Sequence, residues 1–441
     1  MPLQKNQVLT LRVERLSSDG SGVAHSPDGE TVFIPGAAPG DEARVRIVKD
    51  CKRYAFGILD EVLTPSPDRI PVDCAVAGPC GGCSLRHLDY AAELRAKQEN
   101  VADAFARIGG LDVPVLPIVG SPEVNRYRNK VQFPVGVDKS GKPCIGFYAG
   151  RTHRIVPCPD CRLQPGVLNE IGNALCAFFA EKGIQPYSEE TGRGLVRHIF
   201  LRRGAHSGQI MVCLVCTRAK LPSAEELCTR LKAQFAEITT ILLNVNAKNT
   251  NVILGTETHT LYGPGYIEDT LCGVPVQLGP LSFYQVNTLA AEQLYGIAAQ
   301  YAQLTPDDLL LDLYCGMGTI GLSMAAHCRE LIGVEIVPEA IESAKANAAR
   351  MGADVAAKSR FFCADAGQAA TRLAAEGLHP DIVMLDPPRK GCDEATLSAV
   401  VHMSPRRVVY VSCNPATAAR DAAWLEQNGY HAEKVQPVDL F

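Results

Sequence analysis

The chain has 441 residues, more than one compact core usually holds, which predicts two or three domains. Its formal net charge is −5 and its isoelectric point is near 6.1, so only local basic patches could attract a polyanion. The sequence contains no apolar run long enough to span a membrane and no signal peptide, and we therefore expect a cytoplasmic protein. In that compartment, its 17 unevenly spaced cysteines favour metal binding or catalysis over disulfides.

Residues 1–64 carry short strand-like runs separated by turns. The runs cover 8–16, 31–34, 43–48 and 54–62, which predicts a small OB-like β-barrel. Lys49, Lys52, Arg53 and Tyr54 lie together near its end. Barrels of this type bind single-stranded nucleic acid through cations on phosphates and aromatic rings under bases, although solvated charges on a barrel rim are the simpler alternative.

Residues 65–268 are expected to form a central α+β domain that contains a cysteine cluster. Its cysteines are Cys74, the pair in Cys80-Gly81-Gly82-Cys83, and the pair in Cys158-Pro159-Asp160-Cys161. Two Cys-x-x-Cys pairs suit tetrahedral zinc, whereas a single cysteine before the first pair suits an iron–sulfur cluster. The spacing alone does not choose between these two metal centres.

Other segments of the central domain predict a helix and a basic surface. Residues 90–108 form an amphipathic pattern with Leu94, Val101, Phe105 and Ile108 on one stripe. Cations beside aromatic residues follow within a strand-rich region, and they indicate either nucleic-acid binding or inert exposed charge. These basic segments are 126–130, 148–154, Arg197-His198 and Arg202-Arg203.

Residues 269–441 are expected to contain a doubly wound parallel sheet, because strand-like and helical segments alternate from about residue 309. The first turn, from Asp312 to Gly321, fits the Gly-x-Gly-x-x-Gly dinucleotide pattern, and Glu335 closes the next strand. A nicotinamide enzyme is therefore one alternative. Asp312 would repel a pyrophosphate but could help to hold the cationic end of a sulfonium cofactor, which favours S-adenosylmethionine.

Two further motifs are expected at the same edge of this sheet. Asp386-Pro387-Pro388-Arg389 and Ser412-Cys413-Asn414-Pro415 each follow a strand-like run. Cys413 could be a small buried thiol, but the Asn-Pro helix start after it favours a nucleophile. A thiol beside a methyl donor fits methylation of a pyrimidine C5, since that carbon becomes nucleophilic only after a thiolate adds at C6.

These motifs resemble the S-adenosylmethionine-dependent RNA uridine C5-methyltransferase family, most closely its 23S rRNA branch with a TRAM domain and an iron–sulfur cluster. The resemblance covers most of the chain and implies a multidomain α/β protein. It would consist of an N-terminal TRAM barrel, a central domain with the cysteine cluster, and a class I methyltransferase domain. It also includes 126–130 and 282–287, the motif that contains Gln285.

The resemblance also implies roles for individual residues. Cys413 would be the catalytic nucleophile, and 23S rRNA the expected substrate, with tRNA as the alternative and a monomer as the expected state. The 4Fe–4S cluster, with zinc as the alternative, would be bound by Cys74, Cys80, Cys83 and Cys161, which leaves Cys158 as an extra thiol. The cofactor would be contacted by Gln285, Tyr314, Thr319, Glu335, Asp365 and Asp386.

One part of the family pattern lies beyond Phe441. The family continues past its Asp-x-Phe with a His-Val-Glu segment, which carries the general base, and with its last strand, whereas this sequence stops at Asp439-Leu440-Phe441. We therefore expect a 441-residue chain to bind S-adenosylmethionine but to release product slowly or remain attached to RNA. An RNA-binding protein with little turnover is the alternative from another functional class.

Overall fold

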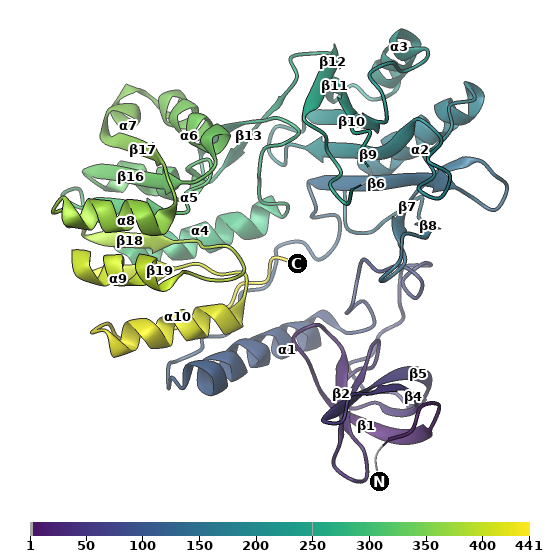
Figure 1. Ribbon diagram of the computed structural model, residues 1–441, viewed down its shortest axis with the longest axis horizontal. Helices are drawn as coiled ribbons and strands as arrows, with labels where there is room; N and C mark the ends of the chain where they lie inside the picture. Colours follow the sequence, from purple (N-terminus) through teal and green to yellow (C-terminus); the bar gives the residue numbers. More distant parts are fainter. Residues whose placement is uncertain (1–2, 249) are drawn as a thin grey trace.

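The computed structural model describes residues 3–248 and 250–441. An N-terminal barrel, a central sheet and a C-terminal α/β domain follow one another along the chain (Figure 1). The C-terminus lies between the central sheet and the C-terminal domain in this view, far from the N-terminus on the barrel. Within the described part of the chain, no helix has the length and apolar character needed to cross a membrane.

The N-terminal segment forms a closed barrel with strand order β1-β2-β3-β5-β4. Exposed and buried residues alternate along β4, as expected for a strand with one face on a core. The predicted barrel is confirmed, but the sequence did not predict β2, a strand of 4 residues without this alternation. The strands are β1 (Val8–Leu16), β2 (Gly22–His25), β3 (Thr31–Ile34), β4 (Glu42–Asp50) and β5 (Tyr54–Thr64).

The predicted connecting helix consists of α1 (Tyr90–Asp103) and a π-helical turn, η1 (Ala104–Gly109). Asp89 caps α1 by accepting a hydrogen bond from the Ala91 amide, 3.0 Å, and η1 ends at Gly110, whose φ is 63°. Phe105 is buried against Ala419, whereas Ile108 is 56% exposed, so the predicted apolar stripe was wrong at its end. The wider π-helical turn rotates Ile108 away from that stripe.

The central sheet has the order β12-β11-β10-β9-β6-β7-β8, and its inner strands β9 and β10 are buried on both faces. All residues of β10 are buried: Val212 and Leu214 pack in one core cluster with α2 (Gly166–Glu181) and α3 (Ala224–Gln234), while Met211 and Cys213 belong to another. The strands are β6 (Lys130–Val137), β7 (Pro143–Tyr148), β8 (Ile155–Pro157), β9 (Val196–Arg203), β10 (Ile210–Cys216), β11 (Ile238–Val245) and β12 (Glu257–Tyr262).

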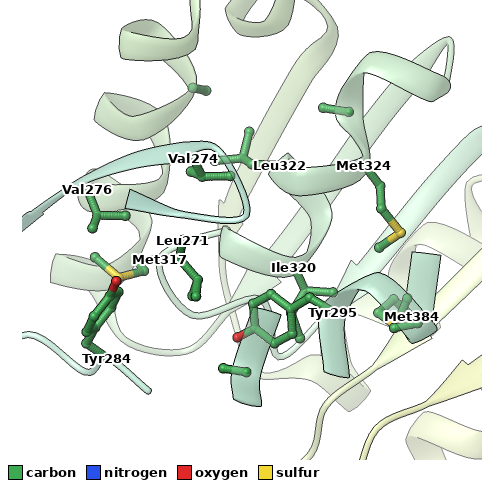
Figure 2. Packing of buried hydrophobic residues seen from close by; sticks show 14 of the residues in the cluster. Leu271, Val274, Val276, Tyr284, Tyr295, Met317, Ile320, Leu322, Met324 and Met384 are labelled. Atoms are coloured by element: carbon green, nitrogen blue, oxygen red, sulfur yellow. The ribbon is translucent and has the colours of Figure 1, made fainter. Parts of the chain in front are cut away.

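A hairpin and a helix join the central sheet to the C-terminal domain. The hairpin is β13 (Ile267–Leu271) and β14 (Val274–Leu278), and the helix is α4 (Thr288–Ala302). Their apolar residues belong to the same core cluster as Met211 and Cys213 and as strands of the C-terminal domain. Figure 2 shows part of this cluster, in which Tyr284, Tyr295, Met317 and Ile320 are labelled. One continuous core therefore crosses the predicted domain boundary at residue 268.

The C-terminal domain contains a parallel sheet with the order β17-β16-β15-β18-β19. Core clusters lie on both of its faces, which confirms the doubly wound arrangement. The sequence did not predict β17, whose residues are only partly buried, and β19 is an edge strand within the described residues. The strands are β15 (Leu309–Leu313), β16 (Glu330–Glu335), β17 (Ser359–Cys363), β18 (Ile382–Leu385) and β19 (Arg407–Tyr410). The helices are α5 (Thr319–Met324), η2 (Ala325–His327), α6 (Pro338–Met351), α7 (Ala353–Lys358), α8 (Ala366–Ala375), α9 (Glu394–Met403) and α10 (Pro415–Gln427).

Candidate active site

The predicted site residues of the C-terminal domain lie where its parallel strands end. Tyr314 follows β15, Glu335 closes β16, Asp386 follows β18 and Cys413 follows β19. Asp365 comes shortly after β17 and caps α8 by accepting a hydrogen bond from the Gln368 amide, 3.1 Å. Since all the strands are parallel, their carboxyl ends lie along one side of the sheet, and these residues share that carboxyl edge. Open α/β sheets bind their ligands there.

The turn after β15 is held in a tight left-handed conformation. The φ angles of Tyr314, Gly316 and Gly318 are 66°, 55° and 81°. A Cβ atom at Gly318 would lie 3.1 Å from Leu322 Cδ1 and 3.2 Å from the Ala344 Cβ, so this position has both a conformational and a steric need for glycine. Positive φ at a tyrosine is uncommon and is typical of functional turns.

Glu335 is fixed beside this turn by two backbone amides. Its Oε2 accepts a hydrogen bond from the Gly316 amide, 3.1 Å, and its Oε1 accepts one from the Val337 amide, 3.0 Å. The carboxylate therefore lies next to the glycine turn in a defined orientation. An acid at the end of the second strand of such a fold is suited to bind ribose hydroxyls.

Two carboxyl groups lie at the same edge, that of the buried Asp312 and that of the half-buried Asp386. Asp312 is 1% exposed; its Oδ2 accepts a hydrogen bond from the Gly321 amide, 3.0 Å, and its Oδ1 has no partner among the described residues. Burial raises the pKa of Asp312 to about 8 and that of Asp386 to about 7, and the negative charge of Asp386 also contributes to the shift at Asp312. Burial penalises the ionised forms of both groups. A cationic ligand nearby would offset this penalty and favour their ionisation.

Gln285 reaches the site from the loop before α4. Its side chain hydrogen-bonds Tyr295, whose hydroxyl lies 3.5 Å from the Thr319 Oγ1. Its backbone oxygen accepts a hydrogen bond from the Asn129 Nδ2, 2.7 Å. The central domain therefore holds the loop that brings Gln285 to the edge of the sheet.

Cys413 is exposed and lines a cavity of about 1060 Å³. Gln285 and Asp386 line the same cavity, but Tyr314, Thr319, Glu335 and Asp365 do not. The glycine turn and its carboxylates thus lie on one side of Asp386, and the cavity with the thiol lies on the other. This division suits a cofactor at the glycine turn and the other substrate in the cavity that contains the thiol.

Residues of α1 and the last residues of the chain also line this cavity. Lys97 and Asn100 come from α1, and residues 433–441 all contribute. Asp439 is buried and accepts hydrogen bonds from the Lys97 Nζ, 2.6 Å, and the Tyr90 hydroxyl, 2.8 Å. The Leu440 carbonyl accepts a further one from the Asn287 Nδ2, 3.0 Å.

The candidate metal-binding cysteines surround a smaller cavity of about 240 Å³ in the central domain. It is lined by Cys74, Cys80, Cys83, Cys158 and Cys161. A Cβ atom at Gly81 would lie 3.0 Å from the Gly150 Cα, so the loop between Cys80 and Cys83 needs glycine to pack closely. No group of three or more of these thiols has a geometry that would hold a metal ion within the described residues.

Charges around the cysteine cavity act on its thiols. Burial raises the pKa of Cys83 to about 11, while the positive charge of Arg86 opposes that shift. The hydrogen bond between Cys158 and Cys161 lowers the pKa of Cys161 to about 6 and raises that of Cys158. Five thiols around one small cavity, with cations at its wall, fit a thiolate-bound iron–sulfur cluster or zinc ion. The other cations that line the cavity are Arg128, Lys130 and Arg162.

Comparison with known proteins identifies the family. The model of the tRNA (uracil-5-)-methyltransferase family matches residues 207–441, and the TRAM domain model matches residues 2–59. An uncharacterized RNA methyltransferase of Halalkalibacterium halodurans is 43% identical over 441 residues, which are 100% of this chain and 95% of that protein. The chain belongs to the RNA uracil-5-methyltransferase family. This membership favours the predicted methyltransferase over the alternative of a nicotinamide enzyme.

Other similar proteins support the same membership. An uncharacterized RNA methyltransferase of Listeria monocytogenes is 42% identical over 443 residues, covering 100% of this chain and 96% of that protein. The crystal structure of the Pyrococcus abyssi tRNA (uracil-54, C5)-methyltransferase with S-adenosyl-L-homocysteine is similar with a TM-score of 0.77 and 25% identity. That similarity covers 99% of this chain and 97% of the Pyrococcus chain. The methyltransferase therefore uses S-adenosylmethionine and acts on RNA.

The structure corrects part of the basic surface predicted for this methyltransferase. Arg202 is buried and donates hydrogen bonds to the carbonyls of Gly279 and Ser282, both 2.7 Å. Arg197 is also buried and donates to backbone carbonyls. Burial lowers the pKa of His198 to about 4. These three side chains are buried inside the protein, so they are not available to bind RNA.

Other predicted cations remain available. Arg128 and Lys130 are half-buried and form no ion pair among the described residues. Burial lowers the pKa of Lys130 below its usual value, and the nearby positive charges of Arg202 and Arg128 add to that shift. In the TRAM barrel, Tyr54 is 40% exposed and packs against Phe33 and Phe56 with ring centroids 5.7 Å and 5.6 Å apart. Lys52 and Arg53 precede Tyr54 in the chain, and cations near an aromatic cluster suit contacts to phosphates and bases.

Sequence reasoning missed several residues that build the site. Lys97 and Tyr90 hold the end of the chain, and Asn129 holds Gln285, each across a long sequence separation. Arg420 and Asp421, which follow Cys413 on α10, hydrogen-bond the loop after Asp386 through Lys390 and Cys392. The only available sequence signal was the position of this charged pair within two turns of the predicted nucleophile.

Proposed function

We propose that this methyltransferase transfers a methyl group to C5 of a uridine in 23S rRNA, with Cys413 as the nucleophile. The observation that carries this proposal is the position of the exposed Cys413 in one cavity with Asp386 and Gln285. An exposed thiol that shares a cavity with the carboxyl group of Asp386 supports chemistry that needs a covalent intermediate. Methylation of a nitrogen would not require such a thiol.

In the proposed reaction, the Cys413 thiolate forms a bond to uracil C6. The electrons of the C5–C6 double bond move toward C5 and the O4 carbonyl, and C5 then forms a bond to the donated methyl group. The bond from that methyl group to the sulfonium sulfur breaks, which leaves S-adenosyl-L-homocysteine. Transfer of the C5 proton to a general base leaves its electron pair to restore the C5–C6 double bond, and the bond from C6 to sulfur breaks, so that the Cys413 thiolate is regenerated.

The target uridine must leave its base stack for this chemistry, because a stacked ring exposes neither C5 nor C6 to the enzyme. The cavity of about 1060 Å³, which extends from Cys413 along the edge strand β19, provides space for a flipped nucleotide. Residues of α1 and residues 433–441 also line this cavity. These residues would shield the reaction from bulk water.

The donor would bind at the glycine turn. We infer that Glu335 contacts the ribose and that Tyr314, Thr319 and Asp365 line the nucleoside part, while Gln285 and Asp386 lie nearest the methyl group. The two amides that fix the Glu335 carboxylate support its role. The buried carboxyl group of Asp312 and the half-buried one of Asp386 support binding of a positively charged donor.

We further propose a 4Fe–4S cluster at the cysteine cavity, with Cys74, Cys80, Cys83 and Cys161 as ligands and zinc as the alternative. The convergence of these thiols on a cavity of about 240 Å³ supports a thiolate-bound centre there. The cations that line the cavity would offset its negative charge. An iron–sulfur centre absorbs near 400 nm, and a zinc centre does not.

A tRNA substrate is the second candidate. The similarity over nearly the whole chain to a tRNA (uracil-54, C5)-methyltransferase favours it. In both cases the TRAM barrel would contribute to RNA affinity through Tyr54 and the cations around it. The position of the barrel beside α1, which itself lines the active-site cavity, supports this contribution (Figure 1).

Labelled methyl transfer tests the proposal. The chain would be incubated with S-adenosylmethionine and, separately, unmodified 23S rRNA and tRNA transcripts, and digested RNA would be analysed for 5-methyluridine. We expect 5-methyluridine in the 23S rRNA and none with Cys413→Ala. Methylation of tRNA alone would replace the first candidate by the second, and methylation by Cys413→Ala at the wild-type rate would refute the mechanism.

A further inference from the structure

The loop that carries Asp386 and the loop that carries Cys413 are joined by α10. The Arg389 carbonyl accepts hydrogen bonds from the Asn414 Nδ2, 3.1 Å, and the Thr417 Oγ1, 3.3 Å. Asn414 also caps α10 by accepting a hydrogen bond from the Ala416 amide, 3.1 Å. The residue directly after Cys413 therefore contacts the end of the Asp386-Pro387-Pro388-Arg389 motif.

Asp421 forms buried hydrogen bonds to both of these chain segments. Its side chain is 2% exposed, and its Oδ2 accepts hydrogen bonds from the Cys392 amide, 2.8 Å, and the Tyr410 hydroxyl, 2.6 Å. Cys392 belongs to the loop after Asp386, and Tyr410 ends the strand before Cys413. One buried side chain thus hydrogen-bonds both the loop after Asp386 and the strand before Cys413.

Arg420 completes the arrangement from the solvent side. Its Nε donates to the Asp421 Oδ1, 2.8 Å, and its Nη2 donates to the carbonyls of Lys390, 3.0 Å, and Cys392, 3.3 Å. The guanidinium therefore binds Asp421 and two backbone oxygens of the loop at once. A lysine could not reproduce this geometry, because it lacks the planar fork of donors.

Gly391 shows how closely the loop approaches this pair. Its φ is +79°, and a Cβ atom there would lie 2.5 Å from both the Arg420 Nη2 and the Asp421 Oδ2. Its amide donates to the Pro388 carbonyl, 2.8 Å, so the turn is tight as well as crowded. Any side chain at this position would have to displace the ion pair from the loop.

We propose that Arg420 and Asp421 are positioning residues that fix the distance between the Asp386 loop and the Cys413 thiol. This inference rests on the proposed function, in which the thiol and the methyl donor act on the same uracil ring. Neither residue touches the reacting atoms. Their effect on rate comes from geometry, since a displacement of about 1 Å at a reacting centre can lower a rate by about 100-fold.

A glycine pair provides a matched test. Gly377 lies in the same domain with a φ of +80°, but a Cβ atom there would meet nothing within 4 Å. Gly391→Ala and Gly377→Ala therefore impose the same backbone strain, and only the first disturbs the ion pair. Arg420→Ala and Arg420→Lys would be compared in the same way with Arg372→Ala, which removes an exposed ion pair to Glu376.

The main measurement is the rate of covalent adduct formation with 5-fluorouridine-substituted rRNA and tRNA transcripts in the presence of S-adenosylmethionine. We expect Gly391→Ala and Arg420→Ala to slow it by about 10- to 100-fold, because the reacting groups lose their alignment. Arg420→Lys should restore little. The dissociation constant of S-adenosyl-L-homocysteine, measured by calorimetry, should stay within about threefold of wild type, which separates positioning from loss of the fold.

Hydrogen exchange supplies a readout that does not depend on activity. The amides of Gly391 and Cys392 are both hydrogen-bonded, and Arg420→Ala should speed their exchange while Arg372→Ala leaves it unchanged. Adduct rates in Gly391→Ala and Arg420→Ala equal to those of their controls would overturn the inference. If wild type formed no adduct with either RNA, the proposed function would fail, and unchanged exchange at Gly391 and Cys392 in Arg420→Ala would separately overturn the positioning role.

Discussion

Asn129 donates a hydrogen bond of 2.7 Å from its Nδ2 to the backbone oxygen of Gln285, and a second of 2.8 Å to the Thr288 Oγ1. Asn129 lies in the segment predicted to face RNA, and Gln285 in the motif predicted to contact the cofactor. The two predicted regions therefore meet through one buried amide. This contact links the segment of the central domain that is predicted to face RNA to the loop that carries Gln285.

Asn129→Ala should weaken both the fold and the site. Loss of two buried hydrogen bonds is expected to cost about 1–3 kcal/mol in the free energy of unfolding, measured by urea denaturation. Binding of S-adenosyl-L-homocysteine, measured by calorimetry, should also weaken because the Gln285 loop is released. Asn173→Ala, which removes an exposed hydrogen bond to the Pro159 carbonyl, is the control and should change neither quantity appreciably.

Cys413→Ala should separate cofactor binding from chemistry. We expect methyl transfer to fall by about 10⁴-fold or more, as for other catalytic nucleophiles, and covalent adducts with 5-fluorouridine RNA to disappear. Binding of S-adenosyl-L-homocysteine should be retained. Cys363→Ala is the matched control, because Cys363 is the other exposed cysteine among the described residues and ends β17, at the opposite edge of the sheet from β19. Equal loss of activity in both variants would contradict a specific role for Cys413.

Asp312→Asn should change the pH dependence of stability. The pKa of Asp312 is raised to about 8 in the folded protein, whereas an unfolded aspartate titrates near about 3.9. Between these values the folded state binds more protons than the unfolded state, so this group lowers stability as pH rises. The difference in melting temperature, variant minus wild type, should therefore increase from pH 4 to pH 8 in thermal scans. A difference that stays constant over this range would argue against the buried, protonated carboxyl group.

Asp386 should make cofactor affinity depend on pH. Its pKa is raised to about 7, so raising the pH from 6 to 8 ionises it, and the positively charged S-adenosylmethionine should then bind up to about 10-fold more tightly. S-adenosyl-L-homocysteine lacks the sulfonium charge and should show a smaller dependence. Calorimetry across this pH range would measure both, and Asp386→Asn should flatten the S-adenosylmethionine profile.

The cysteine cavity should lose its metal when a proposed ligand is replaced. Cys83→Ser and Cys161→Ser are expected to lose iron, and with it the absorbance near 400 nm, after anaerobic purification. Cys158→Ser should retain iron if Cys158 is an extra thiol, and Cys228→Ser, remote from the cavity, serves as a further control. Zinc in place of iron in the wild-type protein, measured by elemental analysis, would support the alternative centre.

Local patterns predicted the strands of the C-terminal domain well, because runs such as 309–313 and 408–411 are apolar and bounded by turns. The same reasoning missed β17, whose side chains are only partly buried at the edge of the sheet. It also assigned Arg197 and Arg202 to a surface for RNA. Their partners are backbone carbonyls 49 and 77 residues away along the chain, a relationship that composition cannot reveal.

The sequence by itself determined which chemical groups stand at the ends of the strands, because each motif directly follows its own strand and parallel strands end at one edge. It therefore predicted Asp386 and Cys413 as neighbours. Only the tertiary structure decided what surrounds them: the Lys97–Asp439 pair across 342 residues, the cavity wall, and the Arg420–Asp421 pair beneath the loops. These contacts depend on how distant elements pack, and packing is a property of the whole core, not of any local pattern.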